Sequence, residues 1–306
     1  MSSMSITFLG TGCMVPTKER NHLSVALEYN GSIFLFDCGE GTQNQIKKFK
    51  VSIGKIKKIF ISHWHGDHVL GLNGLIQTLS NTDNVEKVEI HGPIGTKQFI
   101  EHTLKSTIFE PSIELQIFEH LPKDGEVLNI IDTAEYKIDC VKLAHSVPCI
   151  GYAFKEKDTL NVDKDKAKEL GLEQSPLLSR IKMGLPIELK GKKIKPEDLT
   201  YKKEGKKISF IFDTRPCKEI SKLIKDSDVL VMEATYIFQK HQEKAEENDH
   251  MSAKETALLA AESNVKTLYI THFSQRYKDI KDIEAEAKES FENSISTYDG
   301  MEVNVR

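Results

Sequence analysis

The chain has 306 residues, and 42 Lys and Arg against 46 Asp and Glu give it a formal net charge of −4 with neutral histidines. This length can bury a sizeable core, and 39% hydrophobic with 29% charged residues is typical of globular rather than disordered chains. No apolar run approaches the roughly 20 residues that cross a bilayer, and the first residues lack the basic and apolar regions of a secretory signal. We therefore expect no membrane association.

The five cysteines are scattered along the chain and form no Cys-x-x-Cys pair. An odd number of scattered cysteines does not suit a disulfide framework. We therefore expect reduced thiols and a cytoplasmic location, because disulfides persist mainly in oxidising compartments.

Strand and helix patterns alternate along most of the chain. Short β-branched runs predict strands at 6–9, 25–28, 33–36, 58–61 and 88–90, and Asn-Gly within 29–32 favours a hairpin turn. Helical patterns occupy 42–50, 70–79 and 94–103, and strands dominate from 113 to 154. Later strands are expected at 208–212, 229–232 and 267–270, with a helix at 253–263. This alternation predicts an α/β fold with helices on both faces of packed sheets.

Residues 155–207 interrupt this rhythm, because they lose the dense apolar strands and become polar and lysine-rich. Between Arg180 and Lys207, ten Lys and Arg stand against four Asp and Glu, a net charge of +6. Two short helices are predicted there, at 164–170 and 177–183. Charge runs are usually solvated surface, so the segment is either a plain insertion or a basic arm that grips a polyanion. The motifs on either side of it favour the arm.

The most informative motif is His-Trp-His-Gly-Asp-His at 63–68, which directly follows the predicted strand 58–61 and precedes a helix. Imidazole and carboxylate ligands suit zinc, manganese or iron(II). Four side chains this close cannot all reach one tetrahedral ion without backbone strain. We therefore expect His63 and His65 to bind one ion, and Asp67 and His68 to bind another. The alternative is a histidine-rich surface loop with adventitious metal affinity.

This string resembles the metallo-β-lactamase superfamily, and further motifs resemble its tRNase Z family. Those motifs are Phe-Leu-Gly-Thr-Gly at 8–12, Pro-Thr-Lys-Glu-Arg-Asn at 16–21 and Phe-Asp-Cys-Gly-Glu-Gly-Thr-Gln at 36–43. The resemblance covers essentially the whole chain from Ser5. It implies an αβ/βα four-layer sandwich with a protruding basic arm, in which residues 1–306 form a single domain and 155–207 an inserted flexible arm for tRNA binding.

The resemblance also supplies distant metal ligands, each at the end of a predicted strand: His145, Asp213 and His272. It implies one zinc ion held by His63, His65 and His145. The second zinc ion would be held by Asp67, His68 and His272, with Asp213 bridging the pair. Such a centre can activate water and clamp a phosphodiester. Asp67 could also orient or deprotonate the water, while Asp37 is either a partner that fixes a ligand imidazole or a loop cap.

Two further segments resemble family motifs, Val-Met-Glu-Ala-Thr at 231–235 and the segment that begins at His250. Met232 stands where the family usually has a histidine. The resemblance implies that His250 gives a proton to the leaving 3′-oxygen and that Glu233 orients it. The alternatives are a strand-end ion pair for Glu233 and a helix N-terminal role for His250.

The resemblance implies precursor tRNA as the substrate and a homodimer as the assembly. The implied RNA contacts are Lys18, Arg20, Asn21, Ser274 and Arg276, and arginine can bind phosphate bidentately. Residues 166–172, followed by Ser175-Pro176, resemble the family's arm, with Ser-Pro in place of its Gly-Pro. Binding through the arm should be salt-dependent and should read RNA shape rather than bases.

The activity so implied is that of an endoribonuclease that removes the 3′ trailer from precursor tRNA, leaving a 3′-hydroxyl on the tRNA and a 5′-phosphate on the trailer. A small-molecule hydrolase on the same scaffold is an alternative, but it would not explain the basic insertion or residues 16–21. A non-catalytic RNA-binding protein is another, and it should lack one or more metal ligands, whereas none is missing.

Overall fold

The computed structural model describes residues 3–189 and 191–305. They form two compact units. The core unit comprises residues 3–131, 138–154 and 207–305, and the insertion unit comprises 132–137 and 155–206 without 190. Among the described residues no helix is long and apolar enough to cross a bilayer.

The first sheet of the core unit has seven strands in the order β18-β1-β2-β3-β4-β5-β6. β1, β2 and β3 pair antiparallel, whereas β3 to β6 run parallel. Asn30 (φ 47°) and Gly31 (φ 81°) form the predicted two-residue turn of the β2–β3 hairpin, because this turn type needs positive φ at both positions. The strands are β18 (Glu302–Asn304), β1 (Met4–Gly10), β2 (Ser24–Tyr29), β3 (Ser32–Phe36), β4 (Ile56–Phe60), β5 (Lys87–Pro93) and β6 (Glu114–His120).

The second sheet also has seven strands, in the order β17-β16-β15-β14-β9-β8-β7. β14 to β17 run parallel, so their carboxyl ends lie at one edge. The strands are β17 (Ser294–Ser296), β16 (Thr267–Thr271), β15 (Val229–Glu233), β14 (Lys207–Ile211), β9 (Ile150–Glu156), β8 (Tyr136–Lys142) and β7 (Leu128–Asp132).

Aromatic side chains fill the space between the two sheets. The Phe36 ring of β3 stacks on the Phe210 ring of β14, with centroids 3.7 Å apart, and Phe60 of β4 meets Tyr152 of β9 at 5.2 Å. Side chains alternate along a strand, so Phe36 faces the other sheet while its neighbour Leu35 belongs to the opposite, helix-covered face. This alternation gives one strand two apolar faces and lets it lie in the middle of the fold.

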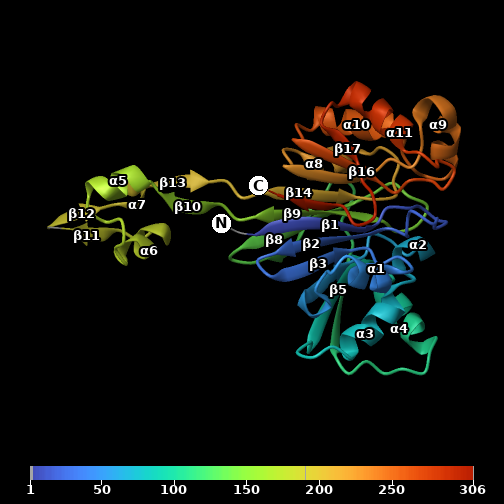
Figure 1. Ribbon diagram of the computed structural model, residues 1–306, viewed down its shortest axis with the longest axis horizontal. Coiled ribbons are helices and arrows are strands. Elements are labelled where there is room, and N and C mark those ends of the chain that lie inside the picture. Colours follow the sequence, from blue (N-terminus) through green and yellow to red (C-terminus); the bar gives the residue numbers. More distant parts are fainter. Residues whose placement is uncertain (1–2, 190, 306) are drawn as a thin grey trace. The chain divides into compact units, whose positions relative to one another are not determined.

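Helices cover the outer face of each sheet, which confirms the predicted four-layer arrangement (Figure 1). The helices on the first sheet are amphipathic, and Leu72, Leu75, Ile76 and Leu79 of α3 are buried. The helical segments associated with the first sheet are α1 (Thr42–Lys48), η1 (Ile53–Lys55), α2 (Gly66–Val69), α3 (Leu72–Ser80) and α4 (Thr96–Lys105). Those associated with the second are α8 (Lys218–Ile224), α9 (Phe238–Glu247), α10 (Ala253–Glu262) and α11 (Lys281–Ser290).

Two helices begin later than the sequence pattern predicts, and a glycine explains each shift. Gly95 at the N-cap of α4 has φ 99°, a left-handed conformation that cannot continue a helix back to residue 94. Gly71 separates α2 from α3: its φ and ψ are helical (−77° and −15°), but its N–H donates to the Cys38 carbonyl oxygen at 3.0 Å instead of continuing the helix, and a Cβ would lie 2.2 Å from the Gly39 carbonyl oxygen. Close backbone approach therefore fixes the start of α3 directly behind the 63–68 loop.

The insertion unit has a small apolar core of its own, formed by Ala167, Leu172, Ile181, Ile187 and Leu199. The two predicted helices are present as α5 (Lys164–Glu169) and α6 (Leu177–Lys182), and a short α7 (Pro196–Leu199) follows them. The sequence pattern missed two antiparallel ribbons: β10 (Thr159–Val162) with β13 (Thr200–Lys203), and β11 (Ile187–Leu189) with β12 (Lys192–Ile194).

Candidate metal centre and active site

The predicted ligands lie where strands end. The 63–68 loop follows β4 of the first sheet, whereas His145, Asp213 and His272 follow β8, β14 and β16 of the second. Asp213 (φ 26°) and His272 (φ 62°) have positive φ, which is uncommon outside glycine. Such backbone conformations cluster at functional sites. Both sheets therefore contribute side chains to one place.

The structure brings all seven predicted ligands together in two groups that share Asp213. One group is His63, His65, His145 and Asp213, and the other is Asp67, His68, Asp213 and His272; within each, the candidate ligand atoms lie within 4.8 Å of one another. His68 Nε2 is 3.2 Å from Asp213 Oδ2, and His272 Nε2 is 3.2 Å from Asp213 Oδ1. Ligand atoms bound about 2.0–2.1 Å from a tetrahedral ion lie about 3.4 Å apart, so this spacing suits metal coordination.

Hydrogen bonds fix the tautomer of four of these imidazoles. His68 Nδ1 donates to Asp37 Oδ2 at 2.7 Å, and His145 Nδ1 donates to the Asp249 carbonyl at 3.1 Å. The Ser62 hydroxyl gives its own proton to Asp37, so it accepts from His63 Nδ1. The Thr235 hydroxyl likewise gives its proton to Glu233 and accepts from His272 Nδ1. In each ring Nδ1 therefore carries a proton, and Nε2 is the nitrogen left to bind a metal ion. His145 Nε2 lies 3.2 Å from His65 Nδ1.

Several of these atoms are buried and make no well-aligned hydrogen bond among the described residues, although imidazole and carboxylate atoms of the centre lie 3.2–3.5 Å from one another. They are the Nε2 atoms of His63, His68 and His272 and the Oδ1 atoms of Asp67 and Asp213. A buried polar atom without a partner is costly. The donor set is nitrogen and oxygen with no thiolate, so the residues present fit a divalent metal ion.

The charges of the ligands also favour a cation. Burial lowers the pKa of His63, and the neighbouring His68 lowers it further, which keeps this imidazole neutral. Burial alone would raise the pKa of Asp213, but His272, His68 and His250 outweigh it and hold the pKa well below its usual value. Burial lowers the pKa of His68 and His272, but Asp213 outweighs it, raising the pKa of His68 well above its usual value and that of His272 to about 10. Without a cation these two imidazoles therefore hold protons beside an ionised carboxylate, and a metal ion would take the place of those protons.

His65 and His145 give this centre its open side. Both are partly exposed, whereas His63, His68 and His272 are fully buried. A mainly apolar recess of about 320 Å³ begins beside His145 and is lined by residues that include Ile94, Leu121 and Val147. A substrate therefore has access to the His65–His145 side.

Glu233 and His250 form a buried pair next to the metal groups. His250 Nδ1 lies 3.2 Å from both carboxylate oxygens of Glu233 and 3.9 Å from Asp213 Oδ2. Burial lowers the pKa of His250, but the carboxylates of Glu233 and Asp213 outweigh it and raise the pKa well above its usual value. Glu233 itself accepts hydrogen bonds from the backbone N–H groups of Thr214 at 2.6 Å and Met251 at 3.1 Å. The His250 imidazole is therefore protonated and is held in place by Glu233.

The residues predicted to contact RNA fall into two kinds. Lys18 and Arg276 are exposed, and the Arg276 guanidinium lies over the Tyr236 ring, 5.7 Å from its centroid. Arg20 is buried and donates to the carbonyl oxygens of Ser274 and Tyr277, the latter at 2.6 Å. Asn21 donates to the Asp299 carboxylate and to the Glu40 carbonyl. Arg20 and Asn21 thus hold the loops that carry Lys18, Ser274 and Arg276.

Sequence reasoning assigned no role to several groups that position the ligands. Ser62 and Thr235 set imidazole orientation, and each stands inside or beside a motif already singled out, so their position was the available signal. The Met14 backbone N–H donates to Asp67 Oδ2 at 2.7 Å. Such a backbone contact has no side-chain signature in a sequence.

The chain is similar to known proteins over nearly its full length. The family model described as Anti-Pycsar protein Apyc1 matches residues 4–175. A ribonuclease Z of Methanosarcina acetivorans is 36% identical over 99% of this chain and 98% of its own length. The human tRNase Z short form has 27% identity and a TM-score of 0.74, covering 99% of this chain and all of its own. The metallo-β-lactamase fold protein YhfI from Bacillus subtilis has 15% identity and a TM-score of 0.69, covering 99% of both chains.

The two helix-covered sheets with histidines and aspartates at their strand ends define a hydrolase of the metallo-β-lactamase fold with a divalent-metal centre. Within that class the similarity extends over nearly the full length of relatives with one shared name. The chain belongs to the ribonuclease Z family.

Proposed function

We propose that this chain is an endoribonuclease that removes the 3′ trailer from precursor tRNA, leaving a 3′-hydroxyl on the tRNA and a 5′-phosphate on the trailer. One observation carries the proposal: ligands from four strand ends meet in two groups that share Asp213, directly beside the Glu233–His250 pair. A two-metal centre with a proton donor beside it suits phosphodiester hydrolysis.

His63, His65 and His145 would hold one ion, Asp67, His68 and His272 the other, and Asp213 would lie between them. We propose zinc for both, because the ligands are imidazoles and carboxylates, although manganese and iron(II) accept the same set. Bound there, the ions would lower the pKa of water and neutralise charge on the phosphodiester.

The chain's own residues would move the two protons of the reaction. Asp67 Oδ2 is held by the Met14 N–H, and Oδ1 has no partner, so Oδ1 is placed to accept the proton of the attacking water. His250 would donate its proton to the leaving 3′-oxygen of the tRNA. Glu233 keeps the His250 ring oriented and charged.

Substrate binding is assigned to residues 155–207 as an inserted flexible arm for tRNA, and to Lys18 and Arg276 near the scissile phosphate. Arg20, Asn21 and Ser274 would position those contacts. We further propose a homodimer that works in the cytoplasm. The free cysteines support a reducing compartment, and the family resemblance supports the dimer, which light scattering can test.

A cleavage assay with a 3′-extended precursor tRNA, with and without a chelator, tests the proposal. We expect chelation to abolish cleavage and metal to restore it, with new ends mapping to the 3′ boundary of the acceptor stem. A gel-shift measurement should show that chelation leaves tRNA binding largely intact. Cleavage that persists after exhaustive chelation would contradict the metal mechanism.

A small phosphodiester, bis(p-nitrophenyl) phosphate, serves as the comparison substrate. If it is hydrolysed while the precursor tRNA is bound but not cut, the alternative of a small-molecule phosphodiesterase replaces this proposal.

A further inference from the structure

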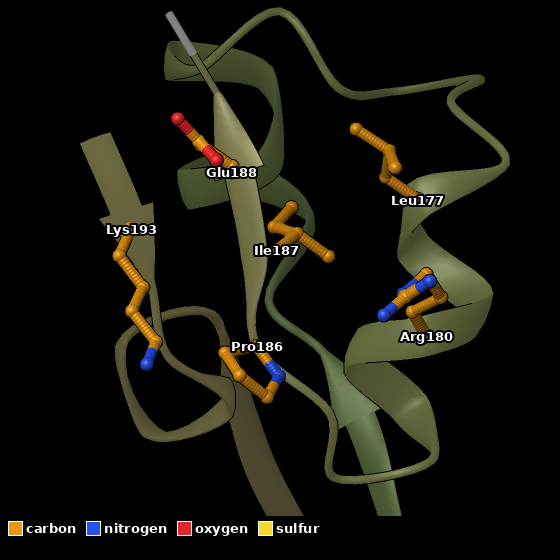
Figure 2. A pocket seen from close by; sticks show the side chains of 6 residues that line it. All are labelled: Leu177, Arg180, Pro186, Ile187, Glu188 and Lys193. Carbon is orange, nitrogen blue, oxygen red and sulfur yellow. The ribbon is translucent and has the colours of Figure 1, made fainter. Parts of the chain in front are cut away.

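The insertion unit contains a recess between α6 and the β11–β12 ribbon (Figure 2). Its volume is about 560 Å³, and it is lined by Leu177, Arg180, Pro186, Ile187, Glu188 and Lys193. This volume falls within the range of small-ligand pockets, roughly 300–1,000 Å³. All of its lining residues belong to one compact unit, so the site does not depend on any other part of the chain.

One wall of the recess is apolar and fixed. Ile187 is 4% exposed and shares the small core of this unit with Ile181 and Leu199. Its side chain projects toward Leu177 in Figure 2, and Pro186 precedes it at the start of β11. Because Ile187 also packs in the core, this wall cannot collapse into the recess without disturbing the core.

Two cations flank this wall. Arg180 lies on α6 and Lys193 on β12, on either side of β11 in Figure 2. Lys193 is the cross-strand partner of Glu188, yet neither Lys193 nor Arg180 has a carboxylate within 4.0 Å among the described residues. Residues 155–206 hold 14 Lys and Arg against 10 Asp and Glu, a surplus of four positive charges in a chain whose total is −4. The lining itself holds two cations and one carboxylate, Glu188, so its net charge of +1 and the positive surplus of the unit together favour an anion.

A ligand that joins a flat apolar body to an anionic group matches this surface. A nucleotide is such a ligand, because its base has two apolar faces and its phosphate carries the charge. Arginine both binds phosphate and stacks on bases, and unstacked bases are what proteins commonly grip in RNA. A contact with backbone phosphates alone would not need the apolar wall.

We propose that this recess binds one unstacked nucleotide of an RNA, with its base against Leu177, Pro186 and Ile187 and its phosphate at Arg180, while Lys193 adds positive charge on the other side of β11. This deepens the proposed function, because it gives the arm a base-binding site in addition to shape recognition. The nucleotide site itself does not depend on which RNA the chain cleaves.

The first test uses the full chain, metal-depleted, and follows its backbone amides by NMR during titration with adenosine 5′-monophosphate or ribose 5-phosphate. We expect shifts at residues 177–193 with both probes. The apparent Kd should be about fivefold or more lower for the mononucleotide, because only it carries a base to stack. Equal affinities, or shifts confined to other segments, would overturn the proposal.

Matched variants separate the recess from general surface charge. Arg180→Ala with Lys193→Ala removes the two lining cations, whereas Lys182→Ala with Lys192→Ala removes two exposed lysines of the same unit that do not line it. Both pairs lose the same charge, so a difference between them reports on the recess and not on general charge. Affinity for precursor tRNA should fall about tenfold or more in the first pair and clearly less in the second. Circular dichroism of each pair checks folding.

The outcomes are distinguishable from failure of the proposed function. Absence of 3′-end cleavage by the unmodified enzyme would remove the endonuclease assignment and leave mononucleotide binding untouched. Mononucleotide binding with equal losses of tRNA affinity in both variant pairs would overturn the assignment of the recess to RNA.

Discussion

At the scale of single residues, Arg215 connects the metal centre to the Glu233–His250 pair. Its guanidinium donates to the His250 carbonyl at 2.5 Å and forms a two-pronged pair with Glu255 at 2.7 and 3.2 Å. Arg215 also follows Asp213 by two positions, so the same turn carries a metal ligand and holds the backbone of His250. Arg215 is therefore a positioning residue for the proton donor.

Replacing Arg215 with Met should lower kcat for precursor tRNA by about 10- to 100-fold with little change in KM, as for other residues that orient a reacting group. Arg215→Lys should recover part of the loss. A substrate with sulfur in place of the leaving 3′-oxygen is diagnostic, because a thiolate leaves without protonation. On that substrate the fall in kcat caused by His250→Ala and by Arg215→Met should be much smaller than on the natural precursor tRNA. If Arg215→Met lowers kcat equally on both substrates, Arg215 does not act through protonation of the leaving group.

The sequence predicted the metal ligands but not most of the groups that position them. His145 and His272 carry no local metal signature, and only family resemblance together with their strand-end position selected them. The partner of His145 is the Asp249 carbonyl, an atom that every residue type offers and that no sequence pattern can mark. The roles of Ser62 and Thr235 depend on where their hydroxyl protons go, which requires coordinates.

At the scale of elements, the parallel pair β5–β6 encloses two histidines that the sequence left without a role. His91 is 3% exposed, its Nδ1 lies 3.0 Å from His120 Nε2, and its Nε2 lies 3.4 Å from Glu89 Oε2. Burial, and secondly His120, lower the pKa of His91 to about 4. The imidazole is therefore neutral in the folded chain, donating to Glu89 and accepting from His120.

This pair predicts a pH window for stability. Unfolded histidine titrates near pH 6.5, so between about pH 6.5 and 4 the unfolded chain binds a proton that folded His91 does not. The free energy of unfolding should fall by about 3 kcal/mol as pH drops through that window and change no further from this source below it. Urea titrations of wild type and His91→Gln with chelator present should show their stability difference shrinking toward pH 4. A difference that stays constant with pH would contradict this.

Strands with dense apolar residues were predictable, and the elements of the insertion unit were less so. Buried strands of both sheets and the Asn-Gly hairpin followed from short β-branched runs and turn chemistry. The ribbons β10–β13 and β11–β12 are short, lysine-rich and half exposed. Strand preference depends on packing against neighbours, so these strands gave little signal on their own.

At the scale of the whole molecule, the proposed tRNA-binding arm and the proposed metal centre belong to different compact units. Replacing residues 164–195 with a Gly-Ser linker should reduce kcat/KM for precursor tRNA by on the order of a hundredfold, because many phosphate contacts are lost. Hydrolysis of bis(p-nitrophenyl) phosphate, which is too small to need the arm, should change by less than about threefold. Equal losses on both substrates would show that the insertion supports the fold rather than the substrate.

The origin of the metal ligands in two sheets has a consequence for the stability of the fold. Because one sheet supplies the 63–68 loop and the other supplies His145, Asp213 and His272, bound ions act as a cross-link between the two halves of the core unit. Ligand binding to the native state alone raises stability by mass action. Metal depletion should therefore lower the melting temperature as well as the catalytic rate, and a cell short of metal would lose the protein to proteolysis, not merely its turnover.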